Sequence, residues 1–99
     1  MSTHISTQGE TLFKALADTQ RRKILTMLRK SELPAGEIAQ RLGVTPATVS
    51  HHLAKLKNAD LVRTRREGQL RIYTINLSVV EEALVLLTRL LSSDKETSA

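Results

Sequence analysis

Apolar side chains recur every three or four residues in five stretches of the chain, and in one further stretch they alternate with polar ones. The helical spacing predicts short helices at 9–17, 20–30, 35–42, 45–58 and 78–91. Alternation on both sides of a turn at 67–69 predicts a β-hairpin between 61 and 76. The pattern therefore predicts one mostly helical domain over residues 1–99, with a small β-hairpin, in the order α-α-α-α-β-β-α. The polar ends, 1–8 and 93–99, are expected to be flexible.

The stretch from 44 to 61 predicts the most sharply bounded of these helices. Thr45 is a good N-cap, and Pro46 suits the first helical position, where its missing N–H costs nothing. One stripe of this helix is apolar and consists of Val49, Leu53 and Leu56. The other face is short, polar and partly cationic, and it consists of Thr48, Ser50, His51, Lys55 and Asn58. Such a face suits the DNA major groove, which admits a helix, although an ordinary solvated helix face has a similar composition.

A second predicted helix ends just before this one. Residues 35–42 place Ile38, Ala39 and Leu42 on one face, after a turn at 31–34, and Gly43 is a good C-cap. Only two residues separate this C-cap from the next N-cap, which is typical of a helix-turn-helix. The hairpin that follows has three arginines near its tip, Arg65, Arg66 and Arg71. A helix-turn-helix followed by a basic hairpin is a winged helix, and these arginines can reach DNA phosphates or the minor groove.

The positive charge is concentrated in the same third of the chain. The formal net charge is +5, and residues 41–75 hold seven basic and two acidic residues, so they carry the whole excess. A localised basic patch is the electrostatic signature of a polyanionic partner. Arg21, Arg22 and Lys23 also begin the helix 20–30, at the end that the helix dipole makes unfavourable for cations. A solvated face, a phosphate partner or an acidic neighbour each fit this second cluster.

Composition excludes several classes of function. The chain has no Cys, so it has no disulfide, thiolate metal site or cysteine redox switch, and one Tyr and one Phe offer little for stacking single strands. No signal pattern or apolar run of membrane length is present, so a cytoplasmic location without a membrane span is expected. There is no glycine-rich phosphate loop or nucleophile motif. Ser50 diverges from His51 and His52 on a helix, so an enzyme is not expected.

The last predicted helix carries more apolar surface than one small core needs. Nine of the thirteen residues in 79–91 are apolar, which covers more than half of the helix circumference. A chain of this size covers such a face with its own core or with a partner, and a second copy of itself is the simplest partner. The pattern therefore predicts a homodimer, with a helix covered by its own core as the alternative.

Five motifs together resemble the ArsR (SmtB-type) repressors, small dimeric winged-helix proteins of bacteria and archaea. The motifs are L-A-D-T-Q-R-R-K-I-L (16–25), A-G-E-I-A-Q-R-L (35–42), V-S-H-H-L-A-K-L (49–56), A-D-L-V (59–62) and I-Y-T-I-N (72–76). The match covers roughly residues 10–92, and the A-G-E-I-A segment looks most like the SdpR-type branch, which is named for an autorepressor.

By this resemblance, the helices at 35–42 and 45–58 form the helix-turn-helix, residues 62–76 form the wing, and the first and last helices form the dimer. Contacts with bases are expected from Thr48, Ser50 and His51. Contacts with phosphates are expected from Thr45, His52, Lys55, Lys57, Arg65, Arg66 and Arg71. The dimer interface is expected to contain Leu12, Phe13, Leu16, Val80, Leu84, Leu87 and Leu91.

The chain departs from the family at the metal sites. Family metal sensors often carry E-L-C-x-C-D before or in the third helix, whereas the aligned residues 32–37 contain no thiol, and the last helix has Glu81 and Glu82 but no His. Zinc and softer metals prefer thiolate and imidazole ligands. Adjacent His51 and His52 point about 100° apart on a helix and make a poor chelate. No metal and no other cofactor is therefore expected.

These observations predict a sequence-specific, DNA-binding transcriptional regulator, and more closely a homodimeric repressor that binds a pseudo-palindromic operator in double-stranded DNA. The resemblance to the autorepressor branch adds control of its own level and a protein that sequesters it. The alternative is a winged-helix interaction module whose basic face binds an acidic protein. Duplex binding measured across salt concentrations distinguishes the two.

Overall fold

The computed structural model describes the backbone of residues 2–98 and the side chains of residues 9–92. The elements follow the chain as α1 (Ser2–Leu16), α2 (Thr19–Lys30), β1 (Leu33–Pro34), α3 (Ala35–Leu42), α4 (Pro46–Asn58), β2 (Val62–Glu67), β3 (Leu70–Ile75) and α5 (Leu77–Ser98). The predicted class, mostly helical with one hairpin between the fourth and fifth helices, is confirmed.

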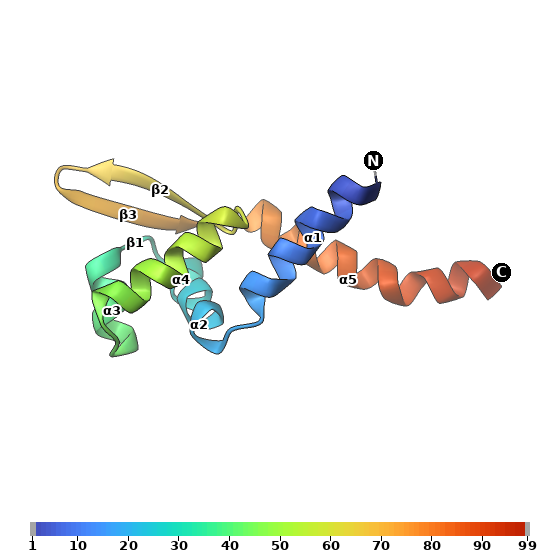
Figure 1. The fold of residues 1–99 in the computed structure, drawn as a ribbon, viewed down its shortest axis with the longest axis horizontal. Helices are drawn as coiled ribbons and strands as arrows, with labels where there is room; N and C mark the ends of the chain where they lie inside the picture. Colours follow the sequence, from blue (N-terminus) through green and yellow to red (C-terminus); the bar gives the residue numbers. More distant parts are fainter. Residues whose placement is uncertain (1, 99) are drawn as a thin grey trace.

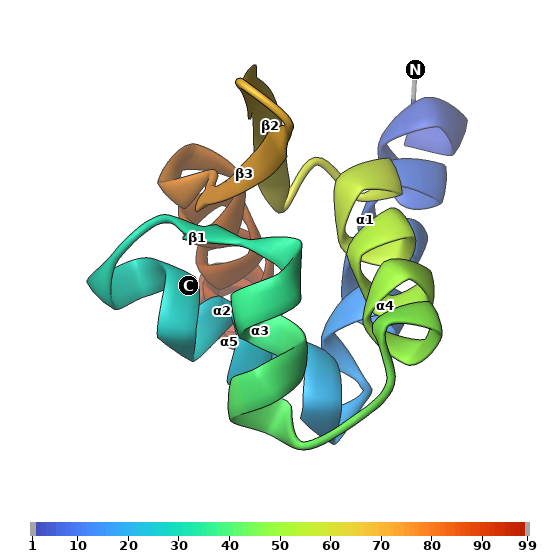
Figure 2. The same cartoon turned by 90° about the vertical axis from the view of Figure 1, so that its left-hand side faces the viewer.

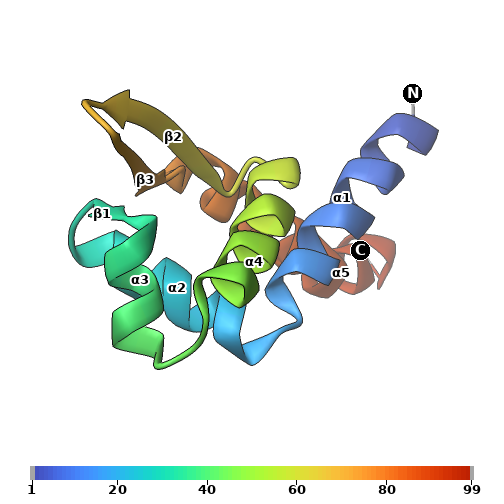
Figure 3. The same cartoon turned by 60° about the vertical axis from the view of Figure 1, so that its left-hand side comes forward.

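The molecule is elongated, with extents of 55 × 25 × 21 Å. Figure 1 shows α2, α3 and α4 gathered at one end, with the β2–β3 hairpin over them, while α5 runs away from this body toward the C-terminus. Seen from the end of the long axis, α3 and α4 lie in front and the hairpin stands at the edge of the body (Figure 2). In the intermediate view α4 lies at the front, between α3 and α1 (Figure 3).

The core lies where the body helices meet the base of the hairpin. The stripe predicted for α4 is buried, with Val49, Leu53 and Leu56 exposed by 1% or less. Ile24 from α2 and Ile38 from α3 pack in the same cluster and are fully buried. Burial of each large aliphatic side chain contributes about 1.5–3 kcal/mol, so this cluster fixes α4 on α2 and α3.

The hairpin belongs to a three-stranded antiparallel sheet in the order β1-β3-β2. The sequence predicted a turn at 31–34, whereas Leu33 and Pro34 pair with Tyr73 and Ile72 of β3. The pattern could not show this strand, because it is two residues long and its second residue is a proline. Leu33 is 4% exposed, so this short strand anchors the base of the wing to the core.

The ends of the outer helices differ from the sequence prediction. The first helix begins at Ser2 rather than at Gly9, and α5 continues to Ser98 instead of ending near 91. The last helix begins at Leu77, one residue before the predicted start at 78, so Ser78 lies inside it. The carbonyl of Asn76 accepts hydrogen bonds from the N–H groups of Val79 and Val80. Flexibility of 1–8 and 93–99 stays a prediction.

The turn between α3 and α4 is formed as predicted. Gly43 has φ 71°, the left-handed conformation that favours glycine, and its N–H donates to the carbonyl of Ala39 at 2.9 Å. The hydroxyl of Thr45 accepts from the N–H of Thr48 at 3.2 Å, so Thr45 is the N-cap of α4. Pro46 follows at the first helical position. These local signals fix where α4 begins.

Replacement of the α4 cap tests this account. Thr45→Ala should lower the free energy of unfolding by about 1 kcal/mol, because the N–H of Thr48 loses its acceptor. Thr45→Ser keeps a hydroxyl at the same position and should retain most of the stability. Urea denaturation of the three proteins without DNA measures the difference, and equal stability of the Ala and Ser variants would contradict it.

Candidate nucleic-acid interface

The exposed face of α4 carries the side chains that sequence analysis assigned to bases. Thr48, Ser50 and His51 are all exposed, as are Lys55 and Asn58 further along the helix. At about 100° per residue, Thr48 and Ser50 lie on opposite flanks of this face and His51 lies between them. The hydroxyl of Thr48 is 2.9 Å from that of Thr45. The face is therefore polar, and most of its side chains are short, which suits a helix that enters a groove.

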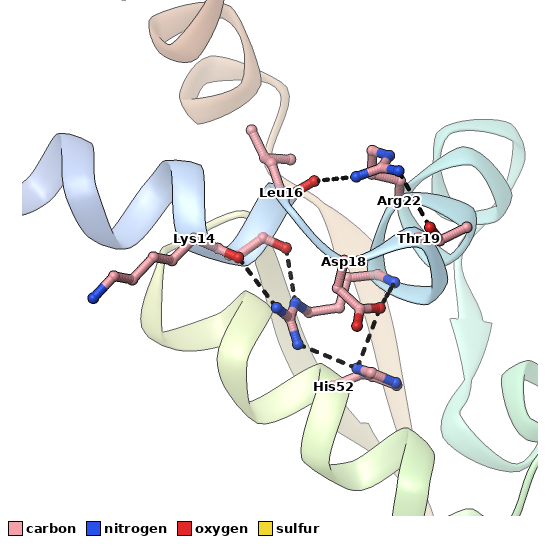
Figure 4. Close-up of polar contacts among 8 residues, drawn as sticks. Lys14, Leu16, Asp18, Thr19, Arg22 and His52 are labelled. Carbon is pink, nitrogen blue, oxygen red and sulfur yellow. Dashed lines mark hydrogen bonds and ion pairs between the residues drawn. The ribbon is translucent and has the colours of Figure 1, made fainter.

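The second histidine of the pair has a different environment. His52 is only 8% exposed, and its Nδ1 lies 3.4 Å from Nη1 of Arg21 and 4.0 Å from Oδ1 of Asp18 (Figure 4). We expected His52 beside DNA phosphates, but the structure turns it inward against the start of α2. The sequence spacing indicates this burial, since His52 lies three residues after Val49 and four before Leu56, on the edge of the buried stripe.

The basic start of α2 is explained by the end of α1. Arg21 donates from Nε to the carbonyl of Ala15 at 2.8 Å and from Nη2 to that of Lys14 at 3.1 Å, while Arg22 donates to the carbonyl of Leu16 at 2.7 Å (Figure 4). These carbonyls end a helix and carry the negative end of its dipole. Arg21 and Arg22 therefore complement α1 rather than disturb α2.

Asp18 completes this junction as the N-cap of α2. Its Oδ1 accepts from the N–H of Arg21 at 3.1 Å. This backbone hydrogen bond, with a second one from Gln20 and the charge of Arg21, holds the pKa of Asp18 below its ordinary value. The carboxylate is thus ionised at neutral pH, where it stabilises the helix start.

Two arginines of the wing lie directly opposite each other. The register of β2 and β3 pairs Arg66 with Arg71, and both are exposed. Nη1 of Arg71 donates to Thr64 at 3.4 Å, and neither guanidinium forms an ion pair with any carboxylate among the described side chains. Like charges directly opposite on two strands repel. The wing therefore holds two uncompensated cations close together near its tip.

Arg65 is different, because two carboxylates compensate it. Its guanidinium donates to both oxygens of Glu32, at 2.9 Å for the longer contact, and to Oε2 of Glu67 at 3.0 Å. The hydrogen bonds from Arg65 lower the pKa of Glu32, and the two carboxylates raise the pKa of Arg65. Arg65 was expected at a phosphate, but in the free protein it joins β2 across β3 to the residue that precedes β1.

The residues expected at a dimer interface divide into three groups by their exposure. Leu12 is 4% exposed and belongs to the core of the protomer itself, so it has little surface left for a partner. Phe13, Leu16 and Val80 are partly buried against that core. Leu84, Leu87 and Leu91 are 63%, 48% and 79% exposed. The apolar excess inferred from the sequence thus lies uncovered along α5. Leu77 and Leu90 are also exposed on this helix, although the predicted dimer interface did not include them.

In the described part of the chain, no group of three or more His, Asp or Glu side chains is placed to hold a metal ion. None of the helices described has both the length and the apolar content to cross a membrane. Lys57 is exposed on α4, on the flank opposite Thr48.

Together, the helix-turn-helix, the exposed polar face of α4 and the arginine-bearing hairpin define a winged-helix DNA-binding protein. The profile described as "Bacterial regulatory protein, arsR family" matches residues 18–64. The transcriptional repressor SdpR of Bacillus subtilis is 37% identical over 73 residues, which are 74% of this chain and 81% of that protein. The chain belongs to the arsR family of bacterial transcriptional regulators, which are not enzymes.

Two further relatives extend the comparison. The transcriptional activator HlyU of Vibrio cholerae is 40% identical over 85 residues, 86% of this chain and 79% of that protein. A structure of HlyU superimposes with a TM-score of 0.71, covering 86% of this chain and 92% of that one. A homodimeric winged helix-turn-helix DNA-binding domain of Mycobacterium bovis, 28% identical, superimposes with a TM-score of 0.78 over 96% of this chain and 89% of that one.

The Glu32–Arg65 contact gives a direct pH test. We expect an NMR titration to place the pKa of Glu32 below its ordinary value, and Arg65→Ala to return it toward that value. Because the folded-state pKa is lowered, this contact should stabilise the wing above the ordinary pKa and be lost as pH falls through the lowered one.

Arg66→Ala is the matched control, since Arg66 is the neighbouring arginine and makes no contact with Glu32. It should leave the pKa of Glu32 unchanged. An unchanged pKa in the Arg65→Ala protein would show that the contact does not persist in solution.

Proposed function

We propose that this chain is a homodimeric, sequence-specific repressor that acts in the cytoplasm and binds a pseudo-palindromic operator with α4 in the major groove. The observation that carries the proposal is the exposed polar face of α4, fixed on the core by its buried stripe and flanked by the uncompensated wing arginines. The two-fold symmetry of a dimer favours an operator with two similar half-sites about one helical turn apart.

Sequence choice is assigned to His51 in the middle of this face and to Ser50 on one of its flanks. Ser50 and His51 are exposed hydrogen-bonding side chains near the N-terminal half of α4, where a recognition helix meets base edges. Thr48 lies on the far flank, with its hydroxyl already beside that of Thr45. We therefore assign Ser50 and His51 to bases, and Thr48 to the edge of the same contact.

Affinity is assigned to phosphate contacts. Arg66 and Arg71 repel each other across the hairpin, so a phosphate placed between them relieves this repulsion as well as adding its own attraction. Lys55 and Lys57 add charge on the two flanks of α4, and Thr45 lies at its start. Arg65 is assigned to wing structure and His52 to the interior, because each already has a partner within the chain.

The dimer is assigned to α5. Leu77, Val80, Leu84, Leu87 and Leu91 are spaced alternately three and four residues apart, which is the spacing of a coiled-coil contact line. We call these five residues the α5 seam. All except the half-buried Val80 are at least 48% exposed. A second copy presents the same line, and the Mycobacterium bovis relative of 28% identity is homodimeric.

Repression is proposed rather than activation because it requires fewer interaction surfaces. The relatives include one named as a repressor and one named as an activator, so family membership leaves the direction open. Occupying a promoter needs only the contacts described above, whereas activation needs a further surface for the transcription machinery. We propose that the repressor controls its own gene, and that a sequestering protein or a falling repressor level, rather than a thiolate-bound metal, ends repression, since the chain has no Cys.

The base contacts give the test of the proposed function. Ser50→Ala and His51→Ala should each reduce the difference in binding free energy between the operator and a random duplex by about 1–3 kcal/mol, because each removes a base contact. The measurement is fluorescence anisotropy with a duplex selected by this protein from a random pool, against a scrambled duplex of equal composition. Unchanged discrimination in both variants would show that α4 does not read the bases.

The wing supplies the contrasting variant in the same assay. Arg66→Ala should weaken binding to both duplexes alike and reduce the salt dependence by about one counterion, because it removes a phosphate contact. Discrimination should stay as in the unchanged protein. A loss of affinity for the selected duplex alone would indicate that Arg66 contacts a base instead.

The α5 seam is tested by paired lysine substitutions. Leu87→Lys should yield monomers at micromolar concentration and weaken duplex binding at least about tenfold, because one half-site then binds alone. Val85→Lys is the matched control, since Val85 is equally exposed, 49% against 48%, but lies outside the seam. Analytical ultracentrifugation measures the mass, and a dimeric Leu87→Lys protein would exclude this interface.

A further inference from the structure

A hollow of about 190 Å³ opens between the end of α1, the start of α2 and the second half of α4. It is lined by Thr11, Lys14 and Ala15 of α1, Arg21 of α2, and Lys55 and Asn58 of α4. The volume is several times the ~30 Å³ that one water occupies in the liquid, so the hollow admits a polyatomic ligand. No residue of the wing or of the α5 seam lines it.

The lining of this hollow is cationic. Three different helices each contribute one basic side chain, Lys14, Arg21 and Lys55, and none of the described residues that line it is acidic. The nearest compensation for Lys14 is Glu10 at 3.7 Å, and both side chains are more than 70% exposed, so the pair is weak. Asn58 adds an amide that can donate hydrogen bonds.

Arg21 is held in place before any ligand arrives. Each of its three guanidinium nitrogens has one partner in the chain, namely the carbonyls of Ala15 and Lys14 and Nδ1 of His52 (Figure 4). A guanidinium has five N–H donors, so two remain for a ligand. Because the side chain is already fixed, binding costs little of its conformational freedom.

We propose that this hollow binds a phosphate group. A tetrahedral, multiply charged oxyanion can accept from donors on several sides at once, whereas a planar carboxylate is satisfied by one fork. Its source is either a free phosphate or phosphate ester, or a backbone phosphate of DNA lying against α4, since Lys55 and Asn58 are exposed on that helix. Binding of the free ion requires neither a dimer nor an operator, so this site goes beyond the proposed function.

The first arm of the test uses the protein alone. Sodium phosphate is titrated into the full-length protein at pH 7 and followed by ¹H–¹⁵N NMR, with sodium chloride of matched ionic strength as reference. We expect saturable shifts at the amides of Thr11, Ala15, Lys55 and Asn58, with a midpoint on the order of 1–10 mM. Shifts equal to those in chloride, or spread evenly over all basic surfaces, would overturn the proposal.

Two variants of exposed residues locate the effect. Lys14→Gln removes one cation of the hollow and should weaken the phosphate midpoint by about threefold. Lys30 is exposed at the end of α2, does not line the hollow and is not assigned to DNA, so Lys30→Gln removes an equal charge and should leave the midpoint unchanged. Equal weakening by both variants would mean general charge attraction and would also overturn the proposal.

The second arm identifies the source of the phosphate. The titration is repeated with the protein saturated by a duplex, and the Lys14→Gln protein is assayed for duplex affinity. If DNA supplies the phosphate, the shifts disappear in the complex and Lys14→Gln weakens every duplex alike. If the source is a free ion, the shifts persist and duplex affinity is unchanged. Failure of the first arm leaves DNA binding untouched, and failure of operator recognition leaves the first arm untouched.

Discussion

The contacts of Arg21 with the end of α1 and with His52 set how α1, α2 and α4 are arranged relative to one another. Through this one side chain, the carbonyls of Lys14 and Ala15 are joined to the middle of α4. The helix that carries the exposed polar face is therefore fixed to the helix that packs beside α5. Any movement of α1 relative to the body must break these charge-assisted hydrogen bonds, two of which are partly buried.

The basic residues of the chain fall into two populations. Arg22 and Arg65 are satisfied by carbonyls or carboxylates of the same chain and serve the fold, and Arg21 does so with three of its five N–H donors. Arg66, Arg71 and the exposed lysines of α4 have no such partner among the described carboxylates. Net charge alone does not separate these populations, since each arginine counts the same in the sum. The structure separates them by showing which cations have partners within the chain. A polyanion is attracted chiefly by charge that the fold has not already neutralised.

Local signals in the sequence predicted the centre of the fold well. Gly43, Thr45 and Pro46 each act within one turn of the chain, so the boundaries of α3 and α4 followed from them directly. The strand at Leu33 and the tie from Arg65 to Glu32 depend on residues more than thirty positions apart, and no periodicity within a short window contains them. His52 was an intermediate case, since its spacing marked it as buried but its polar ring suggested a surface role. The exposed α5 seam followed from composition, but which leucines remain uncovered depends on how α5 lies against α1.

The length of the α5 seam has a consequence for how far apart two copies of α4 can be. Its five positions span fourteen residue steps, from Leu77 to Leu91, or about 21 Å of helix axis. In the proposed dimer, a slip of one seven-residue repeat would shift the partners by about 10 Å, which is three base-pair steps of DNA. Phasing between half-sites tolerates far less than that. The register in which the two α5 seams pair would thus set the distance between the two copies of α4. A change in this register would alter which operators the protein can recognise, without a change in any residue that contacts DNA.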